Sequence, residues 1–151
     1  MVANSIVASL HHIFAFTLTA CIVYEFIAYR KGLAFEEARR LQRVDIGYGI
    51  SAGLLLVVGL LRVFFFEKGV NFYTHNPLFW IKMGLFVLVG LLSIKPTIHF
   101  IRWIPALGKG KAPEISEADF KQVRLLLKLE LLCIALILFA APAMARGLGM
   151  N

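Results

Sequence analysis

Charged residues are scarce in this sequence, and the few present are not spread along the chain. Only 17% of the 151 residues are Asp, Glu, Lys or Arg, whereas 60% are hydrophobic. Soluble domains carry roughly 25% charged and about 45–50% apolar residues. The charges fall in short blocks between long apolar runs, a pattern typical of polytopic membrane chains. The composition therefore excludes an ordinary soluble domain and predicts a single membrane domain over residues 1–151.

The common catalytic and metal-binding motifs are missing as well. The sequence contains no HExxH, Walker loop, GxSxG or dinucleotide fingerprint. Its two cysteines, Cys21 and Cys133, lie inside apolar runs without metal-ligand spacing, so we interpret both as small buried side chains. The net charge of +7 does not indicate nucleic-acid binding, because the basic residues form no soluble face with interleaved aromatics.

Long apolar runs are what the sequence has in abundance. They cover residues 5–29, 45–66, 78–103 and 126–145. Each has about 20 residues or more, enough to cross a hydrocarbon core of roughly 30 Å. Lipid offers the backbone no hydrogen-bond partners, so such segments span as helices. The sequence therefore predicts an all-α fold, an integral membrane four-helix bundle in contact with the lipid bilayer.

The positions of Lys and Arg predict how this bundle is oriented. Ten basic residues lie in the first and third connections, namely Arg30, Lys31, Arg39, Arg40, Arg43, Arg102, Lys109, Lys111, Lys121 and Arg124. The second connection holds only Lys68, and the N-terminal tail holds none. Basic loops stay in the cytoplasm, so we expect an N-out/C-out protein of the bacterial inner (cytoplasmic) membrane.

Three local patterns refine the expected architecture. Residues 32–44 predict a short charged helix lying at the membrane surface. Ser116 and Asp119 have the spacing of a capping box, so the fourth segment is expected to begin early as a cytoplasmic extension. Glycines in the second and third segments predict close helix packing and are compatible with a homodimer. They include Gly47, Gly49, Gly53, Gly84 and Gly90.

The most informative polar residues lie in the outer half of three segments. His11 and His12 come from the first, Arg62 from the second, and Lys82, just after Trp80, from the third. Uncompensated basic groups at bilayer depth are costly, so their convergence calls for an anion or an anionic metal group. Haem b meets this need, because imidazole ligates its iron and Arg or Lys neutralises its propionates. A quinone head group would also suit these donors, and purely structural polar pairing is the remaining interpretation.

Only one of the two adjacent histidines is expected to ligate iron. Neighbouring helical residues point about 100° apart, and we favour His11 over His12. The sixth iron position is left to Lys82, to His75 in the outer loop, or empty. His99 is expected near the opposite membrane face.

A second polar cluster is expected near the cytoplasmic boundary. Its members are Glu25, Asp45, Lys95, His99, Lys128 and Glu130. Pairs such as Glu25 with Lys128 or Asp45 with Lys95 would orient the helices and anchor the interface. A proton path is the functional alternative.

Two resemblances can be stated on particular residues. RVDIGYG, WIKMG and SIKPTIHFIRW resemble a family of small bacterial four-helix predicted membrane proteins of unknown function. More distantly, SLHHIF and NPLFWIKMGL resemble motifs of the small bacterial membrane protoporphyrinogen oxidases, which bind haem. That resemblance implies a haem near His11 and an essential Lys82. The tyrosine–histidine pair and the asparagine–glutamate–proline run of those oxidases are missing here, the latter replaced by KLELLC. The resemblance therefore favours the haem over the oxidase reaction.

Together these features predict a haem-binding membrane redox protein, a b-type cytochrome-like oxidoreductase acting on a porphyrinogen or quinol. His11 would be the metal ligand, Arg62 and Lys82 the catalytic anion partners, and His12 and Trp80 further cofactor contacts. The main alternative is a non-enzymatic scaffold or transporter-like subunit without cofactor. A third hypothesis is a proton-coupled carrier that uses Glu25, Asp45 and Glu130.

Overall fold

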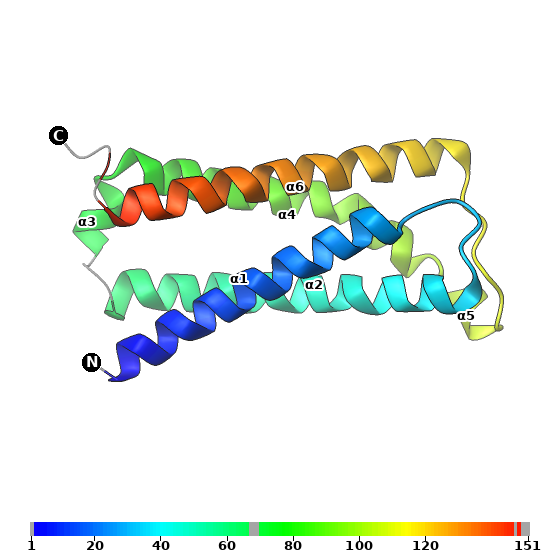
Figure 1. The fold of residues 1–151 in the computed structure, drawn as a ribbon, viewed down its shortest axis with the longest axis horizontal. Helices are drawn as coiled ribbons and strands as arrows, with labels where there is room; N and C mark the ends of the chain where they lie inside the picture. The colour runs from blue at the N-terminus through cyan, green and yellow to red at the C-terminus, as the bar shows by residue number, and fades with distance from the viewer. Residues whose placement is uncertain (1, 67–69, 147, 149–151) are drawn as a thin grey trace.

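Four long helices form the protein. The computed structural model describes residues 2–66, 70–146 and 148. The long helices are α1 (Val2–Ala28), α2 (Phe35–Leu61), α4 (Pro77–Ile101) and α6 (Glu117–Ala145), as Figure 1 shows. Shorter elements are the π-helical turn η1 (Arg62–Phe66), α3 (Val70–Thr74) and α5 (Ile104–Gly108). The described residues contain four helices long and apolar enough to cross a membrane, which confirms the predicted all-α four-helix membrane bundle.

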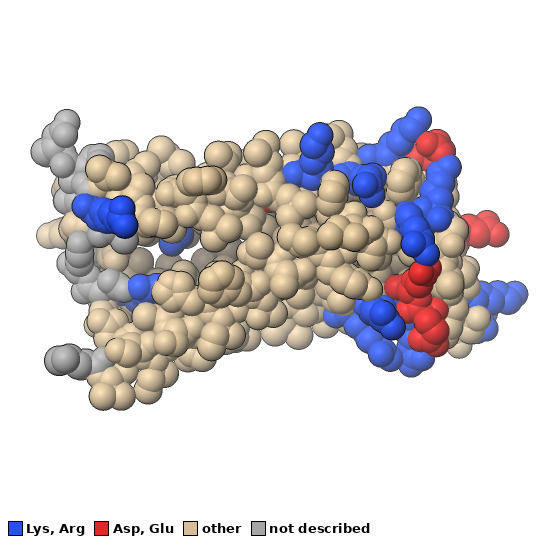
Figure 2. All heavy atoms as spheres, viewed as in Figure 1, with Lys and Arg blue, Asp and Glu red and all other residues tan. Residues whose placement is uncertain are grey.

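The two ends of the bundle differ in charge. Figure 2 shows Lys, Arg, Asp and Glu gathered at one end, which we call the basic end; it holds the α1–α2 and α4–α6 connections. Both chain termini lie at the opposite end, which we call the cavity end (Figure 1). The assignment of the basic end to the cytoplasm stays a prediction, and Lys68 lies outside the described residues.

The helices pack as two pairs. α1 packs chiefly on α2 and α4 chiefly on α6, while contacts between the pairs are fewer and come mainly from α1 with α6. In Figure 1, α1 runs obliquely, so that its C-terminal part lies near α6 and its N-terminal part lies away from it. The pairs are therefore closely packed towards the basic end and separate towards the cavity end.

Aromatic side chains fill the core of the basic half. Tyr29, Phe100 and Trp103 are buried, and the Tyr29 ring lies 5.8 Å from that of Phe100 and 6.3 Å from that of Trp103. Arg124 of α6 donates to the carbonyl oxygens of Phe26 and Tyr29 at 3.4 and 3.2 Å. These carbonyls lie at the C-terminal end of α1, where backbone acceptors lack helical partners and favour a cation. This contact fixes the end of α1 against α6.

The prediction of a separate short helix over residues 32–44 is wrong: residues 35–44 are helical, but they are the first part of the continuous helix α2. The Glu37 carboxylate accepts the backbone N–H of Ala34 at 2.9 Å and so stabilises the start of the helix. Ala38 and Leu41 are fully buried against the rest of the bundle. Packing of these two side chains directs the charged segment into the bundle rather than along the membrane surface.

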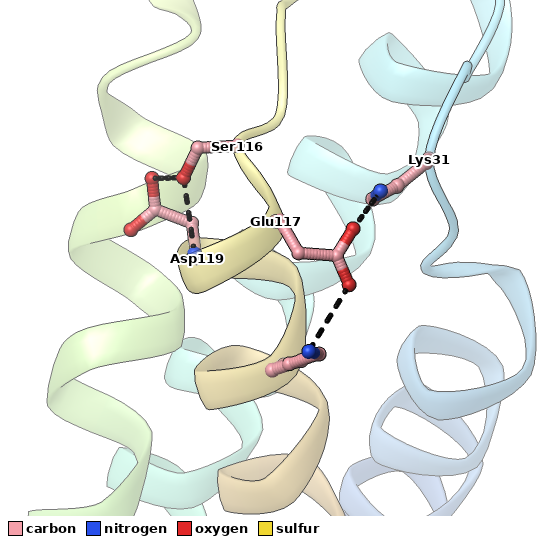
Figure 3. Close-up of polar contacts among 5 residues, drawn as sticks. Lys31, Ser116, Glu117 and Asp119 are labelled. Carbon is pink, nitrogen blue, oxygen red and sulfur yellow. Dashed lines mark hydrogen bonds and ion pairs between the residues drawn. The ribbon is translucent and has the colours of Figure 1, made fainter.

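The early start of the fourth helix is confirmed at Glu117. The Ser116 hydroxyl oxygen accepts the backbone N–H of Asp119 at 3.1 Å, and the hydroxyl donates to the Asp119 carboxylate at 2.7 Å (Figure 3). Glu117 also pairs with Lys31 of the α1–α2 connection and with Lys121 at 3.5 Å (Figure 3). The N-terminus of α6 is thus both capped and tied to the first connection.

Most of the glycines do not bring helices together within the bundle. A Cβ added at Gly49, Gly53, Gly84 or Gly90 would meet no other atom within 4 Å. Close approach at these four positions is therefore wrong within one chain, and the homodimer stays a prediction. Gly59 is different, because a Cβ there would lie 3.3 Å from Cε1 of His11.

Candidate functional site

A cavity of about 450 Å³ lies between the two helix pairs at the cavity end. Figure 2 shows the surface hollowed in this half, with Lys or Arg atoms visible in the hollows. Its lining comes from every long helix and from η1 and α3. The apolar part of the wall includes Leu55, Leu56, Val63, Phe79, Met83, Phe86 and Ile137. The volume is in the range of small-molecule and cofactor sites.

Four of the five residues predicted for the outer site line this cavity. They are His11 and His12 from α1, Arg62 at the start of η1, and Lys82 from α4. Trp80 is not among the lining residues: its side chain is exposed, and its indole N–H donates to the Thr74 carbonyl at 3.0 Å. The convergence of basic and imidazole groups from three segments is therefore present in the structure.

The cavity is basic. None of the described residues that line it is acidic, and Lys82 forms no ion pair with a described carboxylate. Arg62 lies close enough to Lys82 for the two charges to interact. Lys82, a cation in a largely apolar wall, favours an anionic ligand.

The imidazole of His12 presents a free ring nitrogen. Its Nδ1 lies 2.8 Å from the Ala8 carbonyl oxygen, and because a carbonyl only accepts, Nδ1 carries the proton and donates. Nε2 of the neutral ring then keeps its lone pair. A backbone carbonyl that fixes one ring nitrogen in this way is the usual second partner of a metal-ligating histidine.

His11 takes a different position from its neighbour. Its ring packs against Gly59 of α2, while the His11 and His12 ring centroids lie 6.2 Å apart at an interplanar angle of 83°. The near-perpendicular rings agree with the expectation that the two side chains point in different directions, although both reach the cavity.

The other two histidines lie away from the cavity lining. His75 donates through Nδ1 to the Asn71 carbonyl at 2.8 Å, and His99 is buried in the basic half against Tyr29. Of the sixth-position candidates named from the sequence, the structure thus places only Lys82 in the cavity.

The sequence interpretation missed two contributors to the site. Tyr73 of α3 is buried and lines the cavity, and α6 supplies Ile137, Ala141 and Pro142. Pro142 was a usable signal, because it lies near the outer end of the fourth apolar run, at a depth matching the histidines. Tyr73 had no such signal, since the short α3 turn follows from tertiary packing.

The second predicted cluster is present but paired differently. Glu25, Asp45 and Glu130 are buried, whereas Lys95 and Lys128 are exposed on the outside of the bundle. The expected ion pairs of Glu25 with Lys128 and of Asp45 with Lys95 are wrong, as neither occurs among the described residues. Hydroxyl groups from other helices donate to two of the three carboxyls, Tyr48 to Glu130 and Thr97 to Asp45.

Comparison with known proteins gives one finding. No curated protein and no solved structure is detectably similar to the chain. A family model described as "Predicted membrane protein (DUF2214)" matches residues 3–149, nearly the full length. The chain therefore belongs to this family of predicted membrane proteins (DUF2214).

Proposed function

We propose that the cavity binds an amphipathic anion, that this anion is haem b, and that the protein is a membrane redox protein. The observation on which this depends is that two imidazoles and two cations line one cavity whose described wall contains no acidic residue. The cations account for the anionic part of the ligand, and the imidazoles account for a metal within it.

The residues present fit a haem better than a bare metal ion. Among the residues that the structure describes, no three His, Cys, Asp or Glu side chains are grouped to hold a metal ion. A haem supplies four of its own iron ligands and needs only axial imidazole from the protein. The apolar wall suits the macrocycle, and Arg62 and Lys82 suit its carboxylates.

His11, favoured from the sequence, is the proposed ligand, with His12 as the second candidate. The observation that favours His12 is its Nδ1–H donation to Ala8, which leaves Nε2 available. Either ring would come from α1.

Bound haem would supply one-electron transfer at its iron. The protein's own contribution would be to hold the iron through one imidazole, to orient the carboxylates through Arg62 and Lys82, and to exclude water with the apolar wall. A quinol or porphyrinogen that reaches the cavity end is the proposed class of electron donor.

The test is the absorption spectrum of protein purified in mild detergent from haem-supplemented cells. We expect a Soret band that is lost or strongly shifted in either His11→Ala or His12→Ala, whichever residue is the ligand. His75→Ala is the matched control, because His75 has the same backbone contact but lies outside the cavity lining. A colourless wild-type preparation, or a band unchanged in both α1 variants, would contradict the haem proposal.

The anionic part of the proposal has a separate test. If the protein is colourless, native mass spectrometry of wild type and Lys82→Gln still measures whether an anionic amphiphile is retained. Retention by wild type and loss by the variant would support an anion site without haem. Equal retention by both proteins would contradict the anion site.

A further inference from the structure

Three carboxyl groups meet inside the basic half of the bundle. Glu25 of α1 is 1% exposed, Asp45 of α2 is 4% exposed, and Glu130 of α6 is 0% exposed. Asp45 and Glu130 both lie close enough to Glu25 to act on it electrostatically. These residues come from three different spans, so the cluster is a product of the tertiary fold.

No cation among the described residues forms an ion pair with any of the three carboxyls of this cluster. Their hydrogen-bond donors are neutral hydroxyls: Tyr48 donates to Glu130 at 2.9 Å, and Thr97 donates to Asp45 at 2.8 Å. The buried Oε1 atoms of Glu25 and Glu130 have no hydrogen-bond partner.

Two oxygens without hydrogen-bond partners on neighbouring buried carboxyls indicate that protons are bound to these carboxyls. Three adjacent negative charges without a cation cannot coexist in a medium of low dielectric. A protonated carboxyl, in contrast, is both neutral and a donor, so one proton supplies hydrogen bonding as well as charge neutrality. Like-charged carboxyls that share a site hold protons between them and titrate as one unit.

We propose that Glu25, Asp45 and Glu130 form a proton-binding site inside the bundle, which exchanges protons with the basic end. The site is separate from the cavity and does not depend on the proposed haem. The groups that face it are Cys21 from α1, Tyr48 from α2 with Ser93 from α4 beside it, and Thr97 from α4, while Lys95 and Lys128 lie on the exposed side of their helices.

Tyr29 and His99 supply the route of exchange. Tyr29 directly follows the last residue of α1, four residues after Glu25 towards the basic end, and its hydroxyl lies 3.0 Å from Nε2 of His99. Burial raises the pKa of the Tyr29 hydroxyl above its ordinary value, so the hydroxyl keeps its proton, and either group can donate in this hydrogen bond according to the His99 tautomer. Asp119, at the start of α6, acts electrostatically on both groups. The Tyr29–His99 pair thus lies between the cluster and the basic end, which makes it the proposed path of the proton.

Infrared spectroscopy of the protein in lipid vesicles tests the site directly. We expect a carbonyl band of protonated carboxyl at neutral pH, which shifts in deuterated water and decreases as pH rises. Glu130→Gln and Glu25→Gln should each reduce this band, and the combination with Asp45→Asn should abolish it. Glu36→Gln is the matched control, because Glu36 is exposed near the start of α2 and should leave the band unchanged.

Two results would overturn the proposal: no protonated-carboxyl band in folded wild type at neutral pH, or a band unaffected by the Glu25 and Glu130 substitutions. The single variants remain informative if the triple variant does not fold.

Tyr29→Phe tests the route, because it should slow deuterium exchange of the band without removing the band. An unchanged exchange rate would exclude Tyr29 from the route. All these measurements use haem-free protein, so their failure and the failure of the haem proposal are distinguishable.

Discussion

The two halves of this bundle are built from the same four long helices but differ in packing and in charge. In the basic half the helix pairs meet, aromatic rings fill the core, and hydroxyls donate to two of the three buried carboxyls. In the cavity half the pairs separate and leave a space of about 450 Å³ lined by Arg62 and Lys82. The buried acidic side chains lie in the tightly packed half, and the basic side chains Arg62 and Lys82 line the cavity of the other half. This difference supports the proposal that the second half is the ligand site, whereas the first half stabilises the fold.

The largest expected effect is on stability, from truncation of an aromatic core residue in the basic half. Phe100→Ala removes a fully buried ring that contacts Tyr29 and Trp103, and should cost about 3–5 kcal/mol of unfolding free energy. Phe86→Ala, in the cavity wall, should cost less because its ring already borders space. Denaturation in mixed detergent micelles, followed by circular dichroism, measures both variants.

Phe139→Ala is the control for this pair, since its side chain is 80% exposed to the surroundings of the bundle. An equal loss of stability for Phe100→Ala and Phe86→Ala would remove the contrast in packing between the two halves.

A smaller effect is expected at the start of α6. Ser116→Ala removes the acceptor for the Asp119 N–H, and should lower the unfolding free energy by about 1 kcal/mol. Ser116→Asp keeps an acceptor at the cap and should retain most of the stability. The same denaturation experiment applies, and a wild-type midpoint in Ser116→Ala would show that the cap contributes nothing.

Substitution of Gly59 tests the cavity half with little effect on the rest of the fold. In Gly59→Ala the new methyl group would lie 3.3 Å from Cε1 of His11, so the ring must shift by a few tenths of an ångström. We expect several-fold weaker haem binding or a shifted absorption band, measured by titration in detergent. Gly53→Ala adds the same methyl group in open space on the same helix and should bind as wild type. Identical haem binding by the two variants would show that His11 takes no part in binding the ligand.

The smallest effect belongs to the exposed ion pairs of the basic end. Glu117→Gln breaks the contacts with Lys31 and Lys121, all of whose side chains are about half exposed or more. Such pairs are screened by solvent and contribute little. We expect a denaturation midpoint indistinguishable from wild type, and a loss as large as that of Ser116→Ala would contradict this view.

The sequence predicted the helices and the depth of the polar residues along each span well, because both follow from local patterns. Apolar runs gave the four spans, and the spacing of Ser116 and Asp119 gave the early start of α6. The common depth of His11, Arg62 and Lys82 followed from counting residues along each span, and the structure places all three around one cavity.

What the sequence could not predict depends on how helices rotate and pair. Whether Gly53 faces a neighbour or open space is decided by tertiary packing, as is the choice of Thr97 rather than Lys95 as the partner of Asp45. The outward position of Trp80 has the same origin, since its indole finds an acceptor in Thr74 of the preceding turn. Composition alone carries no information about such rotations.

The most direct test of the ligand site pairs a change in the protein with a change in the ligand. Haem and its dimethyl ester, which lacks carboxylate charge, are titrated into wild type, Lys82→Gln and the control Lys95→Gln, whose lysine lies exposed towards the basic end of α4. We expect Lys82→Gln to bind haem about tenfold more weakly but the ester as well as wild type does, because one charge-assisted contact is lost only with haem. The Lys95 variant should match wild type with both ligands. Equal weakening of haem and ester by Lys82→Gln, or no weakening at all, would contradict an anion held by the basic cavity.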